Sequence, residues 1–83
     1  MTTDEEYYAG MLEGVLDGFA LVKAQEIPRT SVSAGVKAVM SVVENTQNPK
    51  TIPGQKMTEI MESWGDRNDY KLVSGTRPKL VRK

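Results

Sequence analysis

Two pairs of carboxylates have the spacing that places both side chains on one face of a helix. Glu13 and Asp17 are four residues apart, and Glu59 and Glu62 are three apart. Such a pair can hold a divalent cation or act as general acid and base. Two carboxylates are too few for a dedicated metal cage, and each pair falls on the polar side of its segment. We therefore expect both pairs to be solvated surface, with no metal and no cofactor bound.

The side chains that most enzymes use as nucleophiles and bases are missing. The 83 residues include no cysteine and no histidine. Their absence excludes thiol nucleophiles, histidine general bases, Ser-His-Asp triads and zinc sites built from Cys and His. The sequence also has no Walker loop, Ser-x-x-Lys motif or EF-hand pattern. We expect that the protein is not an enzyme.

Three glycines, Gly10, Gly14 and Gly18, recur at every fourth position of the first amphipathic segment. Inside a helix each costs about 0.8 to 1 kcal/mol relative to alanine, so the three together cost roughly 2 to 3 kcal/mol. At 100° per residue they form a row with Tyr7 and Leu21, beside the main apolar face. We call these five residues the glycine stripe. A close contact with another backbone would offset the cost of the glycines.

Two occupants fit the glycine stripe. The first is the small-residue side of the next predicted helix in the same chain, made of Ser31, Ala34, Gly35 and Ala38. The second is another protein molecule, which makes the stripe an interaction site. On the second interpretation we expect a protein partner and a homodimer that forms through the first helix.

The charges are sorted along the chain although the formal net charge is zero. Residues 1–30 hold six acidic and two basic residues, whereas residues 66–83 hold six basic and two acidic residues. A basic end of this kind can contact an anionic partner. The candidate contact residues are Lys71, Arg77, Lys79, Arg82 and Lys83.

A helix followed by two short extended segments about a turn has the outline of winged-helix DNA-binding domains. Against that function, the helix predicted over 53–64 exposes Glu59 and Glu62, which phosphates would repel. The sequence pI of about 6.2 also lacks the basic balance typical of nucleic-acid-binding domains. We expect a non-enzymatic protein-interaction module, an accessory regulator or inhibitor. The alternative is a small winged-helix-like regulator that binds nucleic acid through its basic end.

Apolar periodicity and helix breakers divide the chain into three helices and a tail. Thr3 and Glu6 fit a capping box at the start of the first helix, and Pro28 forbids its continuation. Gly65 has the position of a left-handed stop after the third helix. The predicted elements are a helix over about 4–25, a helix over about 31–45, a loop over 46–52, a helix over about 53–64 and a basic tail over 66–83.

These elements predict a single, mainly α domain over residues 1–83. The first two helices form a hairpin, the third short helix closes the core, and the tail is extended or hairpin-like. Pro78 should confine the last extended segment to the edge of any sheet. No apolar run approaches the roughly 20 residues of a membrane span, and the acidic amino terminus differs from a basic signal peptide. We therefore expect a cytoplasmic protein with no membrane contact.

Overall fold

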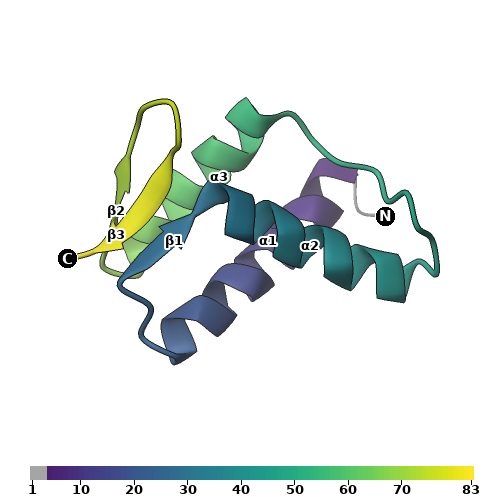
Figure 1. Cartoon of the computed structure of the whole chain (residues 1–83), viewed down its shortest axis with the longest axis horizontal. Helices are drawn as coiled ribbons and strands as arrows, with labels where there is room; N and C mark the ends of the chain where they lie inside the picture. The colour runs from purple at the N-terminus through teal and green to yellow at the C-terminus, as the bar shows by residue number, and fades with distance from the viewer. Residues whose placement is uncertain (1–3) are drawn as a thin grey trace.

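Three helices and a small antiparallel sheet make up the computed structural model, which describes residues 4–83 (Figure 1). The cap predicted at Thr3 lies outside the described residues. The mainly helical fold class with a hairpin at the C-terminal end is confirmed. The elements are α1 (Asp4–Leu21), β1 (Glu26–Pro28), α2 (Arg29–Val43), α3 (Gly54–Arg67), β2 (Tyr70–Val73) and β3 (Lys79–Arg82).

The first helix, α1, begins with three acidic residues, which suit the positive end of the helix dipole. Tyr8, Leu12 and Leu16 recur at four-residue steps and form its buried face. The helix ends earlier than the predicted residue 25, because Lys23 adopts a left-handed φ of 54° and the chain then turns into β1.

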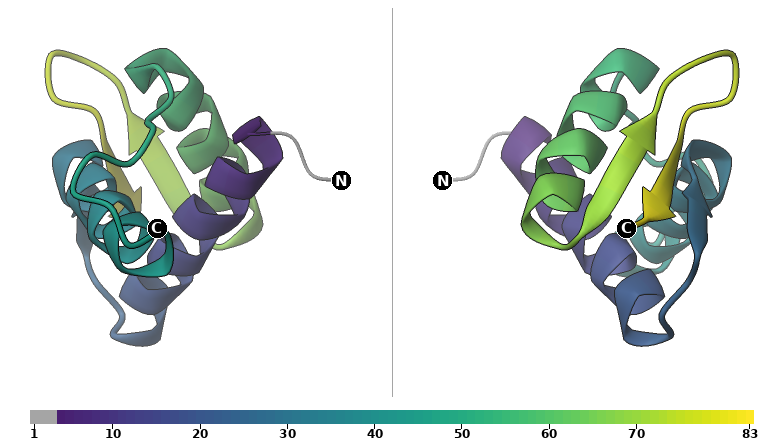
Figure 2. Two further views of the ribbon diagram at one scale, coloured as in Figure 1. Left: turned by 90° about the vertical axis from the view of Figure 1, so that its right-hand side faces the viewer. Right: turned by 90° about the vertical axis from the view of Figure 1, so that its left-hand side faces the viewer.

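The sheet has β3 at its centre, between β1 and β2 (Figure 2). Leu80 of β3 is opposite Ile27 on one side and Leu72 on the other. The sequence did not predict β1, and the expectation that Pro78 confines the last strand to an edge is wrong. Pro78 precedes the first paired residue of β3, and its carbonyl accepts a hydrogen bond from the Arg29 N–H across 3.0 Å.

The third helix continues through Gly65 instead of stopping there. A Cβ atom on Gly65 would lie 3.0 Å from the carbonyl oxygen of Tyr70 and 3.0 Å from Cδ2 of Leu80. The glycine therefore allows the β2–β3 hairpin to approach α3 closely. The left-handed position that follows the helix is occupied by Asp69, with φ of 62°.

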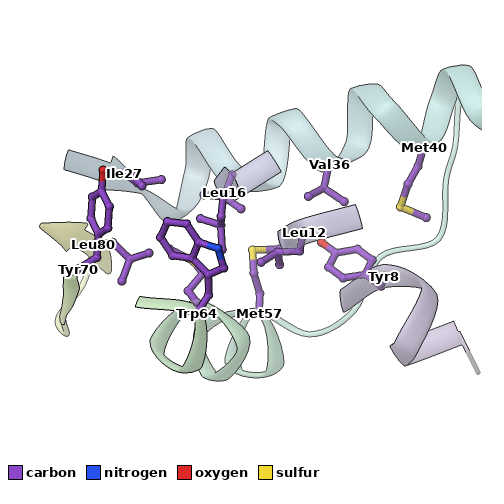
Figure 3. Close-up of a cluster of buried hydrophobic side chains, with 12 residues drawn as sticks. Tyr8, Leu12, Leu16, Ile27, Val36, Met40, Met57, Trp64, Tyr70 and Leu80 are labelled. Atoms are coloured by element: carbon purple, nitrogen blue, oxygen red, sulfur yellow. The ribbon is translucent and has the colours of Figure 1, made fainter. Parts of the chain in front are cut away.

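One hydrophobic core joins the helices to the sheet (Figure 3). It runs from Tyr70, Leu80 and Ile27 at one end, past Trp64, to Met40 at the other. The Trp64 and Tyr70 rings have their centroids 5.3 Å apart. Trp64 is only 1% exposed. The core thus fixes both the hairpin and α3 against α1.

The second helix, α2, packs on α1 and crosses it obliquely (Figure 1). Gly35 of α2 faces Val15 of α1, and a Cβ atom on Gly35 would lie 3.0 Å from Cγ1 of Val15. Val32 and Val36 are buried between the helices, whereas Val43, the last residue of α2, is exposed. Among the described residues, no helix is both long enough and apolar enough to span a membrane.

Candidate functional site

The glycine stripe lies open on the surface of α1. A Cβ atom built on Gly10, Gly14 or Gly18 would meet nothing within 4 Å. The interpretation that α2 packs into the stripe within one chain is therefore wrong, because α2 contacts the neighbouring side of α1 at Val15. At the end of the stripe, Leu21 is 84% exposed. The stripe is exposed from Gly10 to Leu21, whereas Tyr7 at its other end is partly buried against the core.

The predicted carboxylate pair of α1, Glu13 and Asp17, has partners on α3. Asp17 Oδ1 accepts a hydrogen bond from Trp64 Nε1 across 2.8 Å, and Glu13 forms an ion pair with Arg67. On α3 itself, Glu59 lies 3.7 Å from Lys56 Nζ. Over residues 4–83, no three acidic side chains come together in a way that could hold a metal ion.

A second surface is a groove between the β2–β3 loop, the start of α2 and the start of α3. Two adjoining hollows of about 380 and 510 Å³ share Arg29 and Thr30 and together form this groove. Figure 2 shows the projecting hairpin loop and the beginning of α3 at the same end of the molecule, above the first turn of α2. We call this surface the basic groove, and its polar lining residues are Arg29, Thr30, Ser33, Lys37, Thr51, Thr76, Arg77 and Lys79.

Arg29 stands where the two hollows meet. Its Nη1 atom donates a hydrogen bond to Oγ1 of Thr58 across 3.1 Å, and its backbone N–H donates to the carbonyl of Pro78. A Cβ atom on Gly54 would lie 3.3 Å from Nη1, so the first residue of α3 also approaches the guanidinium group. These contacts hold the guanidinium group against α3 and the backbone of Arg29 against the residue that precedes β3.

All charged side chains that line the basic groove are positive. No carboxylate occurs among the residues that line it in the described part of the chain. Lys79 forms an ion pair with Glu26 across 2.9 Å, which reduces its availability to a ligand. Arg29, Lys37 and Arg77 remain as cations next to four hydroxyl side chains. Guanidinium, ammonium and hydroxyl groups are the side chains that donate hydrogen bonds to phosphate oxygens.

The structure separates the predicted basic contacts into two groups. Arg77 and Lys79 line the basic groove, whereas Lys71, Arg82 and Lys83 do not. In Figure 1 the C-terminal end lies away from the hairpin loop.

Sequence reasoning missed Arg29 and Lys37 as members of the groove. The distribution of charge along the sequence indicates them, because Glu44 is the sole acidic residue between positions 27 and 58. The four basic residues in this stretch are Arg29, Lys37, Lys50 and Lys56.

The exposed face of α3 has a different character. Four exposed residues at helical spacing form this face: Gln55, Glu59, Glu62 and Asp66. Three of the four have carboxylate side chains. This confirms the exposure of Glu59 and Glu62 that the sequence indicated.

No family model, no curated protein and no solved structure matches this chain. Indications of its function therefore come from two surfaces of the chain itself, the basic groove and the glycine stripe.

Proposed function

We propose that this chain is a small non-enzymatic regulator that binds nucleic acid through the basic groove. The observation that supports the proposal is the meeting of Arg29 and Arg77 in one groove whose lining includes no carboxylate. The hydroxyl groups of Thr30 and Thr76 lie beside these cations and can donate to the same phosphates. A nucleic-acid ligand also agrees with the cytoplasmic location expected from the sequence.

The order of the elements supports the same proposal. The chain runs α1–β1–α2–α3–β2–β3, with β3 between β1 and β2, which is the topology of winged-helix domains. Topology alone does not specify function, so the proposal depends on the charge of the groove.

A titration of labelled duplex DNA tests the proposal. Each phosphate contact contributes about −0.9 to the slope of log affinity against log salt concentration. Three unpaired cations in the groove predict a slope of about −3. Fluorescence anisotropy of a duplex of about 20 base pairs, measured over a series of salt concentrations, gives this slope. If neither the duplex nor its separated single strands changed the anisotropy at low salt, the proposed function would be excluded.

Self-association through α1 is a second candidate function, favoured by the open glycine stripe. Within residues 4–83, no atom lies within 4 Å of a Cβ built on any of the three glycines, so no close contact there offsets the roughly 2 to 3 kcal/mol that they cost α1. The stripe is also symmetric about Gly14. In a two-fold antiparallel pair of helices, Tyr7 would face Leu21 of the second copy and Gly10 would face Gly18. Such self-complementarity is what an isologous dimer interface requires.

Light scattering tests the second candidate with Gly14→Leu. If two copies meet at Gly14, the leucine side chain prevents their close approach, and the folded variant has the mass of a monomer where the wild type is a dimer. Leu21→Ala serves as a milder variant, because it removes an exposed apolar group from the same stripe without adding bulk. A monomeric wild type at millimolar concentration would exclude this candidate.

A further inference from the structure

We infer that the ligand of the basic groove is a double-stranded nucleic acid, bound through its phosphates and with little dependence on base sequence. This inference rests on the proposed function and narrows the class of ligand. Three features of the described residues carry it: the carboxylates of α3, the lining of the groove and the positions of the aromatic side chains.

The outer face of α3 is unsuited to reading bases. A helix in the major groove places its exposed side chains between two rows of phosphates. Here that face presents Glu59, Glu62 and Asp66, and each would be repelled by the phosphates on both sides. Gln55, at the first turn, is the one amide on this face that suits a base edge. With three carboxylates and a single amide, the outer face of α3 is poorly suited to specifying a sequence.

The basic groove can bind phosphates without reading bases. The polar residues that line it are arginines, lysines, serine and threonines. Hydroxyl and ammonium groups contact the backbone of any sequence and fix the position of the protein on it. Arginine is the side chain that most often binds the edge of guanine. Here the guanidinium group of Arg29 is hydrogen-bonded to Thr58 at the wall of the groove.

The aromatic residues favour a duplex over a single strand. Proteins that bind single strands stack the bases on exposed aromatic rings near a basic groove. Tyr8, Trp64 and Tyr70 are buried in the core of this protein. Tyr7 and Phe19 belong to α1, which does not line the groove. Because no aromatic side chain lines the basic groove in residues 4–83, the higher phosphate density of a duplex makes it the better ligand.

Competition between labelled nucleic acids tests this inference. We expect three duplexes of equal length and unrelated sequence to bind with dissociation constants within about threefold of each other, since specific readers discriminate by about 10³ or more. The corresponding single strand should bind about tenfold more weakly, because it has no aromatic partner. A tenfold preference for one duplex, or tighter binding of the single strand, would overturn the inference while leaving the proposed function intact. Absence of binding to every nucleic acid would overturn both.

A variant of α3 makes the test independent of the chosen sequences. Glu62→Gln removes one carboxylate from the outer face and should raise the affinity for all three duplexes by the same factor. Glu5→Gln on α1 is the matched control and should change none of them. A Glu62→Gln protein that changed the ranking of the three duplexes would show that α3 reads bases, which contradicts the inference.

Discussion

Arg29 and Thr58 join the first residue of α2 to α3 by a hydrogen bond of 3.1 Å between Nη1 and Oγ1. The same Thr58 hydroxyl donates to the carbonyl of Gly54 across 2.9 Å, so it links the cation to the first turn of α3. The arginine is held on the wall of the basic groove, where the two hollows meet. Its orientation is thus set by residues far from it in the sequence.

Thr58→Val should destabilise the protein by about 0.5 to 1.5 kcal/mol, because it removes the hydroxyl that accepts from Arg29 and donates to Gly54. Urea denaturation followed by the fluorescence of the buried Trp64 measures the free energy of unfolding. Ser63→Ala, at an exposed position of the same helix, is the control. Equal effects of the two substitutions would contradict the structural role of Thr58.

Two glycine substitutions should have effects of opposite sign. Gly65→Ala places a Cβ atom 3.0 Å from the backbone oxygen of Tyr70 and should cost about 1 to 3 kcal/mol. Gly14→Ala meets nothing within 4 Å and should stabilise a monomer by up to about 1 kcal/mol through helix propensity. Urea denaturation at low protein concentration measures both. Destabilisation by Gly14→Ala under these conditions would contradict the openness of the glycine stripe.

The helices were predictable because their signals are local. Tyr8, Leu12 and Leu16 have the spacing that buries one face of α1, and the structure buries them. The strand β1 was not predictable, because three residues that end in proline carry no periodicity. They become a strand only by pairing with β3, which is distant in the sequence. For the same reason Gly65 resembled a helix stop, although its role depends on the approach of Tyr70 and Leu80.

The candidate surfaces were predictable in part. Arg77 and Lys79 stood out as members of the basic end, but the groove they line also needs Arg29 and Lys37 from α2. The packing of α2 against the hairpin determines which residues share the groove. No pattern within a single segment of the sequence predicts that packing. The spacing of the glycines predicted the glycine stripe. It did not predict which side of α1 is covered by α2.

Asp17→Ala should destabilise the protein by about 1 to 3 kcal/mol, because it leaves the indole N–H of the buried Trp64 without its acceptor. Glu13→Ala is the matched control one turn earlier on α1. It removes an exposed ion pair with Arg67 and should cost less than about 1 kcal/mol. Thermal denaturation compares the two variants. A larger loss for Glu13→Ala than for Asp17→Ala would contradict the expected order.

Stability should decline at alkaline pH because of Tyr8. Burial raises the pKa of its phenol above the ordinary value of 10.0, so the folded state retains the proton that the unfolded state loses. The contribution of Tyr8 to stability is therefore complete below pH 10 and is lost as the pH rises through the folded-state pKa. Tyr8→Phe should flatten the decline in unfolding free energy above pH 10. Identical pH profiles for wild type and Tyr8→Phe would contradict this.

The salt dependence of duplex binding by Arg77→Gln tests the role of the basic groove most directly. Arg77 lines the groove next to Arg29, whereas Arg82 lies at the other end of β3 and does not line it. Fluorescence anisotropy should show that Arg77→Gln weakens binding and reduces the slope of log affinity against log salt by about 0.9, the contribution of one phosphate contact. Arg82→Gln should leave affinity and slope close to those of the wild type. Equal losses in the two variants, or a slope unchanged by Arg77→Gln, would contradict binding in the groove.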